Sequence, residues 1–126
     1  MDEDIQLWLR CAESDMVSAM ALHQIGQQLN AIFHLQQAVE KTLKAVYIKE
    51  NSTMPPRLHN LQELAGGCRL QLTKEQSRLL RDLTTSYIDS RYPEQWGGSP
   101  MEVSGEQTAG LIAETKDFIA WLGKKL

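Results

Sequence analysis

Hydrophobic positions recur along the chain every three to four residues, which is the spacing of helices that each bury one face. The clearest stretch runs from Asn30 to Tyr47, where this spacing joins the apolar residues Ile32, Phe33, Val39, Leu43, Val46 and Tyr47. Residues three and four apart are neighbours on a helix, so a polar row lies beside that stripe, made of Gln37, Glu40, Lys41 and Lys44. The pattern predicts a long helix from near Gln28 to Lys49 or Glu50, with a polar patch at the edge of the core.

Two further helices flank this one in the sequence. The first is expected from Asp2 to about Ile25, because acidic residues begin it at the positive end of the helix dipole and Gly26 is suited to end it. After the long helix, Pro55-Pro56 favours an extended crossing. A short helix is expected from about Leu58 to Ala65, ended by a pair of glycines.

Capping signals mark the last two predicted helices. Thr73 and Gln76 have the spacing of a capping box, and the helix that they begin should end at or before Tyr92, because a proline follows. Residues 93–103 are expected to form a loop. The last helix should begin near Ser104, which also has a glutamine three residues later.

These elements define a fold class. Strand-like alternation is not evident in the sequence, and short connections between long helices favour antiparallel packing. We therefore expect residues 1–126 to form one all-α domain, an up-and-down antiparallel bundle of four to five helices. A length of 126 residues suits a single core.

Composition excludes several functional classes. The formal net charge of -3 argues against broad nonspecific binding of nucleic acids, although a local basic patch would be compatible with it. The two cysteines and an acidic start, MDEDIQ, indicate a reduced, cytoplasmic protein without a secretory signal. Apolar runs stay well below the roughly 20 residues that span a bilayer. The scattered histidines and cysteines have no metal-ligand spacing, and we expect no cofactor.

Four blocks of the sequence resemble the HEPN domain family. They are WLRCAESDMVSA, FHLQQAVEKTLKA, LHNLQEL and LTTSYIDSRYP, and they follow one another in the order expected for that family. The resemblance implies a helical bundle that usually dimerises, with a site formed by the second helix and the end of the fourth. It also implies, for small members of this type, a minimal nucleotidyltransferase as protein partner, often in a toxin–antitoxin pair.

Other HEPN proteins are ribonucleases, and these have an arginine followed by a histidine after four to six residues. In this chain the corresponding positions after Arg91 are Trp96, Gly97 and Gly98. The ribonuclease interpretation therefore lacks the imidazole that would help the 2′-hydroxyl attack its phosphate. The chain instead resembles the branch with Arg-Tyr-Pro at this point.

Arg91 and Tyr92 are the sharpest candidates for a binding site. A guanidinium can bind phosphate bidentately, and a tyrosine can stack on a base or donate its hydroxyl. The alternative is a helix end in which Arg91 contacts Asp89 or a carbonyl group and Tyr92 packs on the bundle.

The polar row of the long helix supplies the next candidates, Glu40, Lys41 and Lys44. Such a row is by default a solvated face. The functional alternative places Glu40 and Lys44 on the wall of a cleft shared with Arg91. His59 either caps the short helix, forms a hydrogen bond across the bundle, or contacts a ligand in this cleft.

Asp15 lies in the apolar stripe of the first helix. A carboxylate there is costly to bury unless it is paired, and the expected partner is Lys41 or Lys44. A structural ion pair is one interpretation, and a contact with a ligand is the other. His34 is similarly ambiguous between a structural and a ligand contact.

Three functional hypotheses follow. The first is a nucleotide- or phosphate-binding module that works with a nucleotidyltransferase and is itself not an enzyme. The second is a metal-independent ribonuclease with an atypical site made of Arg91, Tyr92 and His59. The third is a purely structural homodimer, for which apolar residues near loops and helix ends could form the interface, namely Met54, Trp96, Met101 and Trp121.

Overall fold

The computed structural model describes residues 2–98 and 102–126, and within these ranges every regular element is helical. The long helices are α1 (Asp2–Gln24), α2 (Gln28–Asn51), α4 (Lys74–Arg91) and α5 (Gly105–Gly123). The short ones are α3 (Leu61–Gly67) and a 3-10 helix, η1 (Pro93–Trp96). The predicted all-α antiparallel bundle is confirmed.

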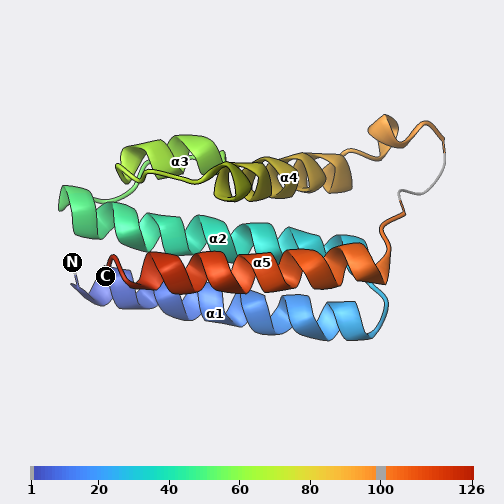
Figure 1. The fold of residues 1–126 in the computed structure, drawn as a ribbon, viewed down its shortest axis with the longest axis horizontal. Coiled ribbons are helices and arrows are strands. Elements are labelled where there is room, and N and C mark those ends of the chain that lie inside the picture. The colour runs from blue at the N-terminus through green and yellow to red at the C-terminus, as the bar shows by residue number, and fades with distance from the viewer. Residues whose placement is uncertain (1, 99–101) are drawn as a thin grey trace.

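Helix α2 lies at the centre of the bundle (Figure 1). It packs against α1, α3, α4 and α5, and α3 and α4 follow one another along the side of α2 that lies away from α1. Burial of α2 on several sides explains why its apolar stripe is the clearest in the sequence. Its fully buried residues include Leu35, Val39 and Leu43.

The capping boxes predicted at Thr73 and Ser104 are both present and begin α4 and α5. Helix α3, in contrast, begins three residues later than predicted, at Leu61 rather than Leu58. The Asn60 side chain sets this start, because its Oδ1 accepts a hydrogen bond from the backbone N–H of Glu63 at 3.0 Å. The helix also continues through the two glycines to Gly67.

The segment after α4 starts with a short helix, within the range 93–103 for which the sequence predicts a loop. It begins with η1, and the Trp96 indole Nε1 donates a hydrogen bond to the Asp89 carbonyl at 2.6 Å. This contact ties the segment back to the last turn of α4. It therefore fixes the direction in which the chain leaves Arg91.

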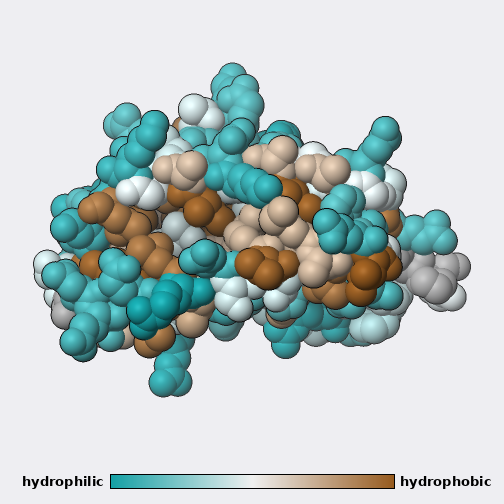
Figure 2. All heavy atoms as spheres, turned by 90° about the horizontal axis from the view of Figure 1, so that it is seen from below, coloured by the Kyte–Doolittle hydropathy of each residue, from teal (hydrophilic) through white to brown (hydrophobic). Residues whose placement is uncertain are grey.

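The apolar residues predicted for an interface differ in their exposure, and further exposed apolar side chains lie on α1. Trp96 and Trp121 are half-buried, Met54 is exposed, and Met101 lies outside the described residues. The exposed apolar residues of α1 are Leu7, Val17 and Met20, with Ile25 just after the helix. Apolar surface, broken by hydrophilic groups, extends along the face seen in Figure 2.

None of the helices in the described part of the chain is long and apolar enough to cross a membrane.

Candidate functional site

The polar row of α2 lies largely inside the bundle, so the default prediction of a solvated face is wrong for two of its members. Glu40 is 3% exposed and Lys44 is 7% exposed. The Lys44 ammonium lies 3.2 Å from Glu40 Oε2 and 5.1 Å from the centre of the Trp8 ring of α1. Together the two contacts offset part of the cost of removing the ammonium from water.

Glu40 also holds the segment that precedes α3. His59 Nδ1 lies 3.2 and 3.3 Å from the two carboxylate oxygens of Glu40, and the His59 side chain remains 65% exposed. The buried Gln36 donates from Nε2 to Glu40 Oε1 at 3.2 Å and to the His59 carbonyl at 3.3 Å. His59 therefore bonds across the bundle, while Asn60 caps the short helix.

Asp15 forms a second cluster, between α1 and α2. Lys41 Nζ lies 2.6 Å from Asp15 Oδ2, and His34 Nδ1 lies 2.8 Å from Asp15 Oδ1. Of the two lysines considered for Asp15, the structure thus places Lys41 beside it and directs Lys44 to Glu40. The Lys41 and His34 side chains keep 25% and 29% of their surface exposed.

Arg91 is exposed at the end of α4, and the side chain of Tyr87 contacts its guanidinium. It donates a hydrogen bond to the Tyr87 hydroxyl, and its guanidinium carbon lies 5.3 Å from the centre of the Tyr87 ring. The Tyr87 ring in turn stacks on Phe33 of α2, with ring centres 5.5 Å apart. Tyr92, the next residue after Arg91, is 49% exposed.

The predicted site residues therefore fall into two groups. One chain of contacts leads from Arg91 through Tyr87 and Phe33 to the ring of His34, and from there to the cluster of Asp15 and Lys41. The other group joins Glu40, Lys44 and His59. Among the residues that the structure describes, no recorded contact connects Arg91 with this second group, and a cleft shared by Arg91, Glu40 and Lys44 stays a prediction.

Sequence reasoning missed three residues that organise these groups. Tyr87 was expected only in the apolar stripe of its helix, although its position four residues before Arg91 is a spacing at which helical side chains meet. Trp8 and Gln36 had no polar role in the prediction, and the sequence offers no local signal for one. Their roles depend on which helix covers which face.

The described residues contain no group of three His, Cys, Asp or Glu side chains that could hold a metal ion. The buried thiol of Cys68 lies apart from both groups and donates to the Leu43 carbonyl at 3.3 Å. Burial, with a smaller contribution from the charge of Glu50, raises the pKa of Cys68 to about 12. An uncharged thiol of this kind is a core residue rather than a nucleophile.

These features define a class of protein, a small helical bundle with a row of polar residues on its central helix and an arginine–tyrosine pair at the end of α4. The model of the HEPN domain family matches residues 5–126, and the chain belongs to that family. A solved structure, that of TT1696 from Thermus thermophilus, is similar in fold with a TM-score of 0.82. The similarity covers 97% of this chain and 98% of TT1696 at 20% sequence identity, which shows a shared fold. A comparison with curated protein sequences gives no match.

Proposed function

We propose that the protein is a nucleotide- or phosphate-binding HEPN module whose ligand contacts lie at the end of α4. The observation that supports this most is the exposed guanidinium of Arg91, held by the ring and hydroxyl of Tyr87 beside the half-exposed Tyr92. A guanidinium in a fixed position loses less conformational entropy when it binds a phosphate. Exposed aromatic rings next to it suit a nucleobase.

The other candidate residues receive different roles in this proposal. Lys41 and His34 retain some exposure around Asp15, so both can contribute hydrogen bonds to a ligand on that side of α2. Glu40 and Lys44 neutralise one another in the interior, so we assign them to the support of the site rather than to the ligand. His59 is more exposed, but Glu40 holds its Nδ1.

The partners that the family resemblance implies remain part of the proposal. A minimal nucleotidyltransferase would carry the chemistry, and the pair would act as a toxin–antitoxin system. The exposed apolar residues of α1, Leu7 and Val17 among them, support self-association into a homodimer through that helix. We place the dimer surface there rather than at the residues expected from the sequence.

Thermal unfolding with a panel of nucleotides tests the binding proposal. A ligand at 100 times its dissociation constant stabilises the fold by about 2.7 kcal/mol, which raises the midpoint by several degrees. We expect this increase in the wild-type protein and in an Arg81→Ala control, which removes an exposed arginine of the same helix. We expect its loss in Arg91→Ala. Equal increases in both variants would place the ligand elsewhere, and no increase in the wild type would leave the structural-dimer hypothesis as the better one.

One observation favours the ribonuclease as a second candidate. The buried carboxylate of Glu40 holds Nδ1 of the exposed His59, which is how a carboxylate orients an imidazole that exchanges protons through its other nitrogen. Such an enzyme would cleave RNA in the presence of a chelator, and His59→Ala would abolish the cleavage. Chelator-resistant cleavage that persists in His59→Ala would come from other residues or from a contaminant.

A further inference from the structure

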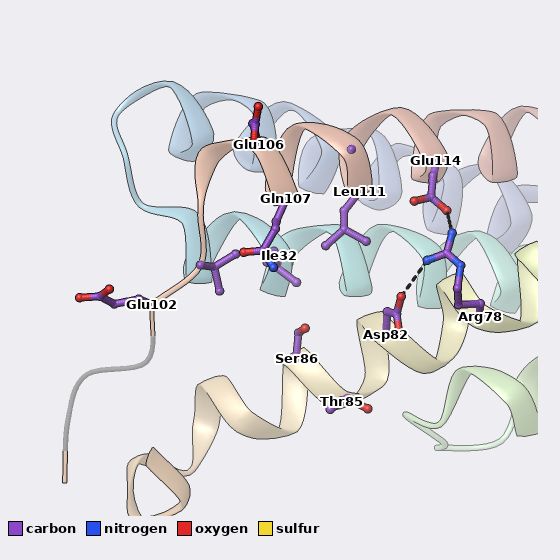
Figure 3. A pocket seen from close by; sticks show the side chains of 12 residues that line it. Ile32, Arg78, Asp82, Thr85, Ser86, Glu102, Glu106, Gln107, Leu111 and Glu114 are labelled. Carbon is purple, nitrogen blue, oxygen red and sulfur yellow. Dashed lines mark hydrogen bonds and ion pairs between the residues drawn. The ribbon is translucent and has the colours of Figure 1, made fainter. Parts of the chain in front are cut away.

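A groove lies between α4 and α5, beside the start of α2 (Figure 3). Its volume is about 560 Å³, and it opens to solvent along its side. The half-buried side chains of Leu111, on α5, and Val103 supply its apolar surface, and Ile32 of α2, which is 1% exposed, lies beneath them. None of the residues assigned to the Arg91 site or to the Glu40 cluster lines it.

The two sites lie on different faces of α4. Asp82 and Ser86 face the groove, whereas Arg91 is nine residues beyond Asp82. At about 100° per residue this separation places Arg91 roughly half a turn away around the helix axis. A ligand in the groove is therefore independent of the nucleotide site proposed above.

The groove is acidic. Its lining contains four carboxylates, from Asp82, Glu102, Glu106 and Glu114, and one guanidinium, from Arg78. Arg78 bridges α4 and α5 by binding both Asp82, at 2.8 Å, and Glu114 (Figure 3). The hydrogen bond to Glu114, followed by the charge of that residue, raises the pKa of Arg78, so the arginine stays charged and engaged with its own carboxylates.

The carboxylates of Glu102 and Glu106, at the end of the groove away from Arg78, are not neutralised by an arginine in this way. Within the described residues, no ion pair is recorded for Glu102 or Glu106. Both carboxylates are exposed at the rim of the groove, where Figure 3 shows them pointing away from Leu111. Apolar surface bordered by uncompensated carboxylates is complementary to an apolar segment that carries lysines or arginines.

A glycine in the middle of α5 provides an independent observation. Gly110 lies four residues after Glu106 and four before Glu114, on the face of α5 that lines the groove. A glycine within a helix costs about 1 kcal/mol relative to alanine. A Cβ atom added here would meet nothing within 4 Å, so packing inside the chain does not require the glycine. The missing side chain does permit another backbone to approach α5 closely.

We propose that this groove is a docking site for a basic amphipathic helix of a partner protein. Its apolar residues would cover Leu111 and Val103, and its lysines or arginines would pair with Glu106 and Glu102 at the rim. An open groove favours such a segment over a small cation, because small ligands bind where most of their surface is enclosed.

An NMR titration of the isotope-labelled protein tests the proposal. The probe is a helical peptide of about five turns with leucines on one face and lysines beside them, compared with the same peptide in which glutamates replace the lysines. We expect the basic peptide to shift the amide signals of Ile32, Ser86 and Leu111 at low salt. We expect the acidic peptide to leave them unchanged.

Two variants and a control sharpen the test. Glu106→Lys reverses the charge at the open end, and Gly110→Met fills the space beside the α5 backbone; each should weaken binding about tenfold or more. Gly110→Met should also unfold at the same temperature as wild type or higher, because no neighbour clashes with it. Glu13→Lys, at an exposed carboxylate of α1 without a recorded ion pair, should leave the affinity within about twofold.

Several results would overturn the proposal. They are absence of shifts at millimolar peptide, shifts confined to another face, equal binding of the acidic peptide, and equal affinity for the Glu106→Lys and Gly110→Met proteins. Spermine is the probe for a small polycation. If spermine shifts the same amides and the basic peptide does not, the groove is a small-molecule site and the docking proposal is wrong.

Discussion

The buried pair of Glu40 and Lys44 allows a quantitative test of how the central helix is held. Replacing Glu40 by leucine would leave the Lys44 ammonium, whose side chain is 9% exposed, without its carboxylate. Stranding one partner of a buried pair costs about 3–5 kcal/mol. The Trp8 ring recovers only part of this, since a cation–π contact contributes about 0.5–2 kcal/mol. We therefore expect the Glu40→Leu variant to lose roughly 3 kcal/mol of unfolding free energy.

Replacing the other partner, Lys44, should lower the free energy of unfolding by less. In Lys44→Met, the carboxylate of Glu40 keeps its contacts with Gln36 and His59, and the loss is that of one charged hydrogen bond, about 1.5–3 kcal/mol. The double variant replaces the pair by apolar side chains of similar length. Such a replacement is often close to neutral, so the double variant should be more stable than Glu40→Leu alone. Single losses of about 3 and about 1.5–3 kcal/mol, with a loss below about 3 kcal/mol in the double variant, require a coupling energy of at least about 1.5 kcal/mol between the two positions.

Urea unfolding, extrapolated linearly to water, measures the four free energies of this cycle. Glu13→Leu is the control for placing a leucine at a carboxylate position on an exposed helix face, and it should change stability by no more than about 0.5 kcal/mol. The reasoning is refuted if Glu40→Leu loses less than about 1 kcal/mol. It is also refuted if the double variant loses the sum of the two single losses, because independent effects mean that the pair does not interact.

Three further predictions concern single positions. Asp15→Ala should lose about 2–3 kcal/mol in the same urea assay, because its two partially exposed partners regain only part of their hydration, whereas Glu13→Ala should stay within about 0.5 kcal/mol of wild type; equal losses would reject the Asp15 cluster. Gly67→Ala places a Cβ atom 2.7 Å from a tyrosine ring of α2 and should lower stability by about 1–3 kcal/mol, whereas Gly66→Ala meets nothing within 4 Å and should be neutral or stabilising; a neutral Gly67→Ala would contradict this close packing. Burial, and then the charge of a nearby glutamate, raises the pKa of Cys68 from 9.0 to about 12, so its contribution to stability is complete below pH 9.0 and is lost as the pH rises toward 12. Unfolding free energies across that interval should fall more steeply for wild type than for Cys68→Ala, and equal slopes would contradict the raised pKa.

The elements that were predicted well depend on short-range signals. The capping boxes at Thr73 and Ser104 use side chains three residues apart, so the sequence contains the whole interaction. The start of α3 was misplaced because the sequence offers two signals there. The prolines indicate a boundary near Leu58, but Asn60 supplies the side-chain acceptor that the first turn requires. An acceptor that satisfies a free N–H group determines the first residue of the helix.

The candidate site was harder to predict because burial depends on the neighbouring elements. Helical spacing correctly places Glu40 beside Lys44, but it does not reveal that Trp8 and the segment before α3 cover them. The same limit applies to Arg91. Its neighbour Tyr87 is close in sequence, yet the stacking partner Phe33 comes from a distant helix.

Burial also distinguishes residues that stabilise the fold from residues that can contact a ligand, a difference that the sequence alone did not show. Glu40 and Lys44 are almost fully enclosed, so their replacement should act first on the free energy of unfolding. Arg91 is exposed and contacts a ring of its own helix, so Arg91→Ala should change the free energy by no more than about 0.5 kcal/mol. A loss of nucleotide stabilisation in Arg91→Ala at unchanged intrinsic stability therefore points to ligand contact rather than to damage of the fold. The same loss in Glu40→Leu would not, because that variant weakens the helix from which Phe33 supports the arginine's aromatic neighbour.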